Sequence, residues 1–182
     1  MAENDAHQGK RKFEEESSAN SDMKEEEYDS DHDMYVGNSV MDRETREKYW
    51  KQVEESDGFD ITLDLELDCS LGAPIVPQRH CLNKTEFNEI SCLAIDAFNS
   101  HNNTKFQFVE NLSVTTTIAA GYWCRNTFRA KDSDSDASFI FQAMGFWGIS
   151  GDRIIAFCRL KKTPTQGDEY PPYSNPDYEV PH

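Results

Sequence analysis

The order of apolar and polar side chains divides the chain into segments with different secondary structure. From Phe59 to Asp68 apolar and polar residues alternate without a break, which predicts a half-buried strand with one acidic face. From Thr85 to Phe98 the apolar residues instead recur at helical spacing, and Thr85 is placed to cap the helix. Turn-forming residues follow at 99–103, so we expect the helix to stop there.

The sequence after this helix predicts strands. Phe106–Val114 carries an irregularity at Glu110-Asn111, and further strands are predicted at Tyr122–Ala130, Phe139–Phe146 and Ile154–Leu160. Strands in hairpin order behind one helix are typical of an α+β layer architecture. We therefore predict one α-helix packed on a curved, four- to five-stranded antiparallel sheet.

Both ends of the chain differ in composition from this predicted domain. The formal net charge is −16, and most of it lies in residues 1–70, which hold 8 basic and 22 acidic side chains. We expect residues 1–57 to form an acidic, mostly disordered leader with a short charged helix at 42–55, because so few apolar side chains cannot offset the entropy lost on ordering. The domain is expected to span 58–163, followed by a flexible, proline-rich tail at 164–182.

The negative charge and the short apolar stretches restrict the expected partners and compartment. A field of this sign repels phosphate backbones, so we expect no nucleic-acid binding. No apolar stretch approaches the length that spans a bilayer, so we expect no membrane partner. The polar N-terminus does not resemble a secretory signal, and the five cysteines are scattered, so we expect a cytoplasmic or nuclear protein with reduced thiols.

Motifs for catalysis, metals and cofactors are lacking. Neither GxGxxG nor GxxxxGK[ST] occurs, and no cluster of Cys and His has the spacing of a zinc site. The acidic runs 29–33 and 132–136 begin like calcium loops but lack the glycine and glutamate that such loops need at positions six and twelve. His80 and Cys81 are adjacent, so on a strand their side chains would point to opposite faces. We therefore expect a protein that is not an enzyme and has no metal or cofactor.

The predicted helix carries a family resemblance. Residues 90–99 resemble the helix signature of plant cystatins at Ile90, Ala94, Ile95, Phe98 and Asn99, and depart from it at positions 92 and 93. Residues 105–109 and 122–131 resemble two of that family's strands. The resemblance covers about residues 72–162, and with its acidic leader the chain looks most like the plant cystatin-related proteins of the cystatin/monellin-like superfamily. It implies a cystatin-like fold.

This resemblance also implies a function, the reversible occlusion of the active-site cleft of papain-like cysteine proteases. The family's inhibitors use a wedge made of an N-terminal glycine, a QxVxG turn and a Pro-Trp hairpin. Here Thr117 and Ala119 replace the glutamine and the valine, and Gly121 matches. Aligned without gaps, Ile149-Ser150 stands at the Pro-Trp position, whereas a shift of three residues presents Trp147. The candidate contact residues are Gly72, Thr117, Ile118, Ala119, Ala120, Gly121 and Trp147.

The altered motif leaves more than one function open. Each lost contact costs about 1–3 kcal/mol, so we expect at most weak inhibition. The alternative is an interaction or regulatory scaffold that binds another protein partner without inhibiting a protease. A third hypothesis, a small-molecule-binding or enzymatic variant of the fold, would require a polar pocket between helix and sheet. The protein is expected to be a monomer or a domain-swapped dimer.

Overall fold

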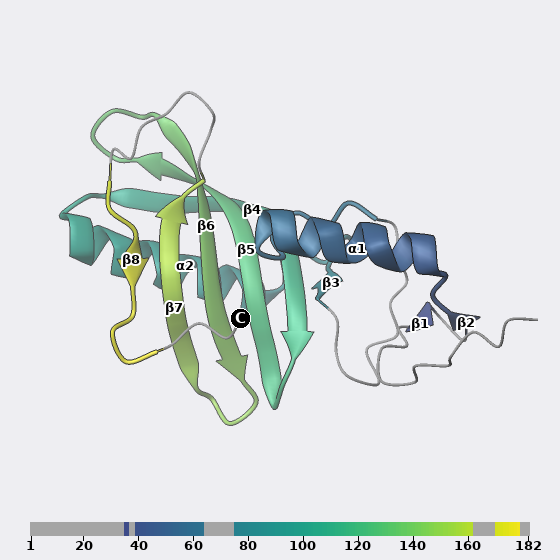
Figure 1. Ribbon diagram of the computed structural model, residues 1–182. Helices are drawn as coiled ribbons and strands as arrows, with labels where there is room; N and C mark the ends of the chain where they lie inside the picture. Colours follow the sequence, from purple (N-terminus) through teal and green to yellow (C-terminus); the bar gives the residue numbers. More distant parts are fainter. Residues whose placement is uncertain (1–34, 37–38, 64–74, 162–169, 179–182) are drawn as a thin grey trace, which may run out of the picture. The chain divides into compact units, whose positions relative to one another are not determined.

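Antiparallel pairing of consecutive strands builds the sheet of this protein, which we describe from a computed structural model (Figure 1). The structure describes residues 35–36, 39–63, 75–161 and 170–178, and all of them belong to one unit, Asp33–His182. The elements are β1 (Tyr35–Val36), β2 (Ser39–Val40), α1 (Arg43–Ser56), β3 (Val76–Pro77), α2 (Thr85–Asn102), β4 (Phe106–Ile118), β5 (Gly121–Asp132), β6 (Ser138–Gly148), β7 (Arg153–Leu160) and β8 (Tyr173–Ser174).

The α+β class predicted from the sequence is confirmed, but the predicted number of strands is too low. The described sheet is open and has six strands in the order β3-β4-β5-β6-β7-β8, rather than four or five. The outermost strands, β3 and β8, are two residues long and are paired to β4 and β7. A strand of two residues has no alternating pattern, so neither edge strand could be recognised from periodicity.

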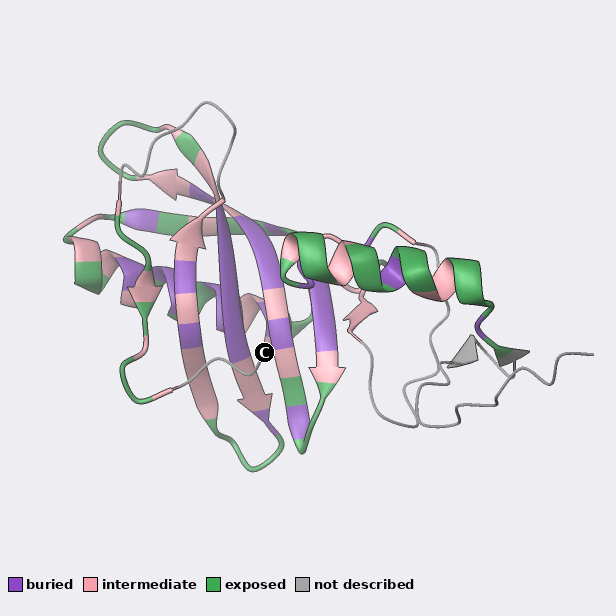
Figure 2. Cartoon of the chain, in the orientation of Figure 1, coloured by how far each residue is buried: buried purple, intermediate pink, exposed green. Residues whose placement is uncertain are grey.

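Helix α2 covers one face of the sheet and forms the larger core. Its buried side chains include Ala94, Ile95 and Phe98, which cluster with Phe128 and Phe141 of the sheet. The Phe98 and Phe141 rings meet edge to face with centroids 5.1 Å apart, a favourable aromatic arrangement. Figure 2 shows buried positions recurring along the central strands, where this helix packs.

The ends of α2 differ from their prediction. Lys84 rather than Thr85 occupies the N-cap position, and no side chain there bonds to the first turn. At the other end the helix continues to Asn102, where the Asn102 amide donates to the Phe98 carbonyl. It stops at Asn103, whose left-handed conformation (φ 54°) is one that asparagine tolerates.

The segment after α1 packs against the opposite face of the sheet. Phe59 and Ile61 are buried there, as their alternation with polar residues predicts, yet residues 59–63 form no strand. They lie over the face of the sheet, where the Phe59 ring packs 6.0 Å from Phe157 and the Gly58 carbonyl accepts a hydrogen bond from Thr115. The strand predicted for this stretch is therefore wrong over the described residues, and residues 64–68 lie outside them.

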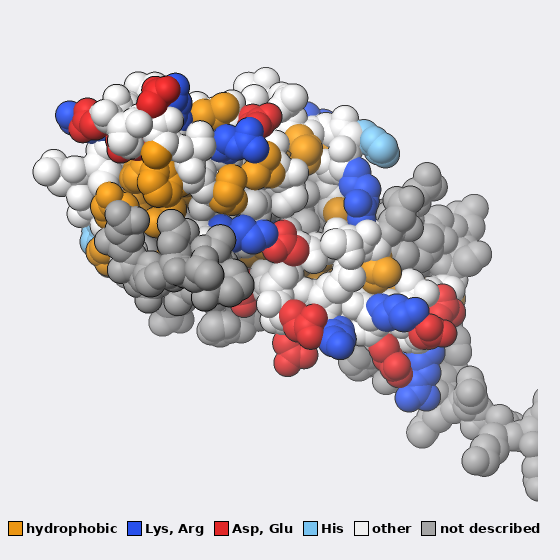
Figure 3. Space-filling model, turned by 90° about the horizontal axis from the view of Figure 1, so that it is seen from above, with side chains coloured by type: hydrophobic (Ala, Val, Ile, Leu, Met, Phe, Trp, Pro, Cys, Tyr) orange, Lys and Arg blue, Asp and Glu red, His pale blue; other side chains and the backbone are white. Residues whose placement is uncertain are grey.

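Helix α1 begins and ends within one residue of the charged helix predicted at 42–55. Asp42 caps it by accepting a hydrogen bond from the Thr45 N–H. Figure 3 shows positive and negative side chains interspersed along the helix, three pairs of which form ion pairs four residues apart. Its one fully buried side chain, Tyr49, clusters with Met41 and Ile61 and donates to the Ile75 carbonyl at 2.9 Å.

The C-terminal region also differs from the expected flexible tail. Residues 164–169 and 179–182 lie outside the described residues, but 170–178 contain β8 and pack on the sheet. Tyr170 and Tyr173 of this segment pack against the core formed by α2 and the sheet. The prolines of this segment therefore do not prevent it from pairing with strand β7 at the edge of the sheet.

Candidate functional site

Two hairpin turns lie together at one end of the sheet (Figure 1). The β4–β5 turn consists of Ala119 and Ala120, and the β6–β7 turn of residues 149–152. Strand β5 pairs with both β4 and β6, so the two turns are brought next to each other. Apolar side chains are exposed at both turns: Ile118, the last residue of β4, is 46% accessible and Ile149 is 76% accessible.

Small and turn-forming residues determine the shape of each turn. Ala120 adopts a left-handed conformation (φ 45°), and the Ala119 N–H donates to the Gly121 carbonyl at 3.0 Å. In the second turn the Gly148 N–H donates to the Asp152 carbonyl at 2.9 Å. The two turns are therefore held by backbone hydrogen bonds within each hairpin.

Gly121 allows the two turns to touch. A Cβ atom at this position would lie 2.3 Å from the Trp147 carbonyl oxygen and 2.8 Å from the Gly148 Cα, far inside contact distance. The close approach lets the Ile149 N–H donate to the Ala120 carbonyl at 3.3 Å, which links one turn to the other. We call residues 118–121 and 148–152 the hairpin edge.

Trp147 packs against helix α2 and is not part of the exposed surface of the hairpin edge. Its indole N–H donates to the Glu89 carboxylate of α2 at 3.0 Å, and the Arg153 guanidinium lies 4.1 Å above its ring. Arg153 also pairs with Glu89 at 3.1 Å and donates to the Gly148 carbonyl at 3.2 Å. The hydrogen bonds from Trp147 and Arg153 lower the pKa of the Glu89 carboxyl below its usual value. This Glu89–Trp147–Arg153 cluster fixes the second turn to the helix.

The structure brings together only part of the predicted contact set. Ile118, Ala119, Ala120 and Gly121 form one side of the hairpin edge. Thr117 precedes them on β4, but its hydroxyl accepts a hydrogen bond from Arg125 at 3.3 Å on the face away from α2. Trp147 is engaged by α2, and Gly72 lies outside the described residues.

Ile149 was not among the predicted contact residues, although it is the most exposed apolar side chain of the edge. It lies between Gly148 and Ser150 in a run of turn-forming residues that ends with Gly151-Asp152. An isoleucine in such a turn has no strand neighbour to pack against, and this signal could have identified it. In the gap-free alignment to plant cystatins given above, its position is the one that stands at their Pro-Trp site.

The described residues contain no cluster of side chains suited to holding a metal ion. No group of three or more His, Cys, Asp or Glu side chains lies close enough together to hold a metal ion in the parts of the chain that the structure describes. Burial raises the pKa of the Cys124 thiol to about 12, so this thiol is protonated at neutral pH. His101 packs edge to face against Tyr173, and exposed His80 lies in a loop.

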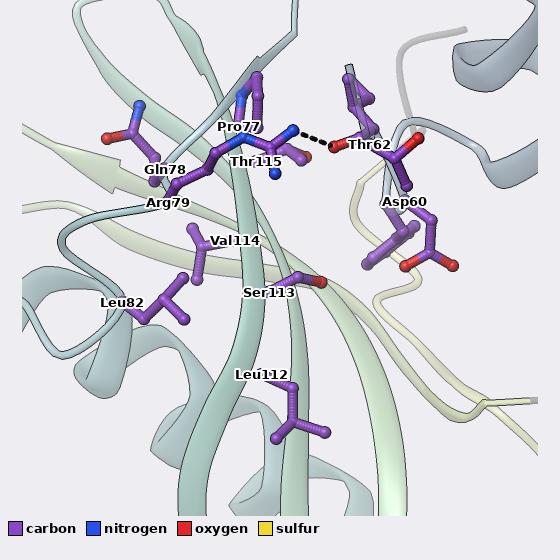
Figure 4. A pocket seen from close by; sticks show the side chains of 12 residues that line it. Asp60, Thr62, Pro77, Gln78, Arg79, Leu82, Leu112, Ser113, Val114 and Thr115 are labelled. Atoms are coloured by element: carbon purple, nitrogen blue, oxygen red, sulfur yellow. Dashed lines mark hydrogen bonds between the residues drawn. The ribbon is translucent and has the colours of Figure 1, made fainter. Parts of the chain in front are cut away.

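A pocket lies beside β4, and residues 112–115 of that strand line it (Figure 4). This pocket of about 320 Å³ is lined by residues 59–62, 77–79, 82 and 112–115. The Arg79 guanidinium donates to the Leu63 carbonyl at 2.6 Å and to the Ile61 carbonyl at 3.4 Å, and Asp60 pairs with Lys161 at 2.7 Å. Its charged groups thus have partners within the chain, which leaves the hairpin edge as the stronger candidate site.

Comparison with known proteins adds no family to this description. No protein-family model and no curated protein sequence matches the chain. Among the described residues, no helix combines the length and the apolar character needed to cross a membrane.

Proposed function

We propose that this chain is a non-enzymatic binding protein that inserts the hairpin edge into the active-site cleft of a papain-like cysteine protease. The observation that carries this proposal is the linked pair of turns, from which Ile118, the two alanines and Ile149 expose apolar surface along one edge. Apolar side chains lose no hydrogen bonds when a cleft covers them, and their burial is the main driving force of association.

The order of the structural elements supports a cystatin-like fold for this proposal. A short edge strand (β3), a long helix (α2) and four strands in hairpin order follow one another, and the two turns meet at one end of the sheet. The match of residues 90–99 to the plant cystatin helix signature adds to this likeness, as does the glycine at position 121.

In the proposed mode of action the edge occludes the cleft without being cleaved. The tip residues lie in tight turns, whereas a protease cleaves an extended strand laid across its nucleophile. The backbone bonds within and between the turns hold the edge in its binding shape, which reduces the entropy lost on association. The edge contacts the protease through apolar side chains, which form no covalent bond with its catalytic thiolate, so inhibition is reversible.

A second candidate function is protein binding without protease inhibition. Thr117 is bonded to Arg125, and the Trp147 indole N–H is bonded to Glu89. The groups that would replace the amide and the indole of the cystatin wedge thus already make hydrogen bonds within the chain. This observation favours an interaction scaffold that uses the same edge for another partner.

Steady-state inhibition of papain by the full chain tests the proposal, with Ile149→Ser as the main variant. Fully burying an isoleucine contributes about 1.5–3 kcal/mol, so we expect Ile149→Ser to weaken inhibition by about 30-fold. Gly121→Trp should abolish inhibition by forcing the turns apart. The matched control is Val109→Ser, which changes an equally apolar, 50% exposed position on β4 away from the edge.

Two results would reject the proposal, the first by excluding protease inhibition itself and the second by excluding the hairpin edge as the contact surface. One is a folded wild-type chain that leaves papain fully active at about 100 μM, a concentration that corresponds to little more than 5 kcal/mol of binding free energy. The other is an equal loss of inhibition in Ile149→Ser and Val109→Ser, which would place the contact elsewhere.

A further inference from the structure

The C-terminal segment 170–178 lies along the outer edge of β7 in the manner of a bound peptide. β8 pairs antiparallel with Phe157 and Cys158, and the Asn175 N–H donates to the Ala156 carbonyl at 2.9 Å. These contacts extend the sheet by one short strand (Figure 1). Main-chain pairing of this kind is how extended peptides add to a free sheet edge.

One end of the segment is anchored by a tyrosine ring on the α2 side of the sheet. The Tyr170 ring lies 6.2 Å from Phe98 and 5.9 Å from Phe106, in edge-to-face contact with both. Next to it, the Asn102 amide donates to the Pro171 carbonyl at 3.2 Å. The end of α2 and the start of β4 therefore form a site that binds one aromatic ring and one backbone carbonyl. We call such an aromatic contact site a ring site.

The other end is anchored by a tyrosine ring on the opposite face. The Tyr178 ring lies 5.0 Å from Trp123, which lies 5.1 Å from Phe146. Trp123 is adjacent to Cys124, whose side chain packs against α2, so the alternation of a strand places Trp123 on the far face. The segment thus passes from one face of the sheet, around the β7 edge, to the other face.

We propose that the β7 edge and the ring sites at Phe98/Phe106 and Trp123/Phe146 form a peptide-binding groove, filled here by residues 170–178. Its partner is an extended segment of another protein. That segment has a short strand flanked by prolines, with one tyrosine before the strand and one after it. The chemistry of this partner is that of the segment already seated there, Tyr-Pro-Pro-Tyr-Ser-Asn-Pro-Asp-Tyr. We call this surface the β7 groove.

Binding of a partner to the β7 groove would be regulated, because residues 170–178 of the same chain compete with the partner for the groove. A segment joined by a short linker competes at an effective concentration on the order of millimolar, so a partner binds only when it exceeds this value or when the tethered segment is weakened. Trp123, Phe146, Phe98 and Phe106 lie outside the hairpin edge, so this proposal does not depend on protease inhibition.

The test uses the full chain with Tyr170→Ala and Tyr178→Ala together, and a labelled synthetic peptide of residues 170–178. Fluorescence anisotropy should show the peptide binding this double variant at least about tenfold more tightly than the wild type, where the tethered segment competes. The same peptide with its first and last tyrosines, which correspond to Tyr170 and Tyr178, replaced by alanine should bind neither protein. A variant with Tyr122→Ala, an exposed tyrosine on β5, is the matched control and should behave as the wild type.

Equal peptide binding to the wild type and to a folded double variant would overturn the proposal. Should the double variant fail to fold, hydrogen exchange of the wild type decides instead. Exchange of the Asn175 amide at least about 100-fold faster than that of central β5 amides would show that the segment detaches locally, and equal rates would refute this. A wild-type dimer that the double variant cannot form would assign the groove to the segment of a second copy and overturn the proposed partner.

Discussion

Gly121→Ala should destabilise the protein through a steric clash between its two hairpins, and Gly151→Ala measures how much of the loss comes from backbone conformation alone. Both glycines have positive φ angles, 144° at Gly121 and 102° at Gly151. A Cβ at Gly121 would lie 2.3 Å from the Trp147 carbonyl oxygen, whereas a Cβ at Gly151 meets nothing within 4 Å. Both substitutions therefore add the same methyl group at a positive φ angle, but only the one at Gly121 brings it against other atoms.

The expected difference follows from these distances. A non-glycine residue in a strained backbone conformation costs about 1–3 kcal/mol, and this applies to both variants. The loss of unfolded-state freedom from glycine to alanine is also common to both and cancels in the comparison. Overpacking against a fixed backbone adds about 1–3 kcal/mol, and only Gly121→Ala meets such a backbone. Gly121→Ala should therefore lower the free energy of unfolding by about 1–3 kcal/mol more than Gly151→Ala.

Urea unfolding of both variants, followed by tryptophan fluorescence and by circular dichroism, measures this difference. Coincident transitions with unchanged slopes would show that the midpoints report stability. Equal midpoints for the two variants would refute the clash at Gly121, and with it the close contact that defines the hairpin edge. A lower midpoint for Gly151→Ala would show that backbone conformation, not packing, dominates at these turns.

Three further predictions concern the supports of the site and the core. The pKa of the Glu89 carboxyl is lowered in the folded state, so its contribution is present above the unfolded pKa and should be lost as the pH falls from about 4. Tryptophan emission should change with this loss, and the change should be smaller in Glu89→Gln. Ser91→Ala should lower the free energy of unfolding by about 1–3 kcal/mol, because the hydroxyl joins two buried asparagine amides, whereas Ser100→Ala on the exposed face should change little. Tyr49→Phe should cost about 1 kcal/mol by removing its hydrogen bond to a backbone carbonyl.

Each of these predictions can fail in a distinct way. A Glu89→Gln protein with the same acid transition as the wild type would show that another carboxylate controls it. Equal urea midpoints for Ser91→Ala and Ser100→Ala would mean that the buried amides find other partners. An unchanged midpoint for Tyr49→Phe would show that α1 contributes nothing to stability through this bond.

Local patterns in the sequence predicted the elements that depend on neighbours close along the chain. The helical spacing of Phe87, Ile90, Ala94 and Phe98 located α2, because one face of a helix must be apolar to pack on a sheet. The irregularity predicted at Glu110-Asn111 also lies where the β4–β5 register shifts. The same reasoning located the hairpin turns, whereas the resemblance to plant cystatins is what marked residues 118–121 as contact residues.

Contacts between distant residues decided the rest, because a periodic pattern shows which side of a segment is buried but not what buries it. Alternation at Phe59 and Ile61 correctly implied burial, yet these residues lie on the face of the sheet and not in its ladder. Trp147 could be an exposed anchor or a packed side chain by sequence alone, and Glu89, 58 residues away, determined the outcome. The sequence by itself thus determined α2, the main strands and their turns, while tertiary structure determined which apolar side chains the edge exposes and what fills the β7 groove.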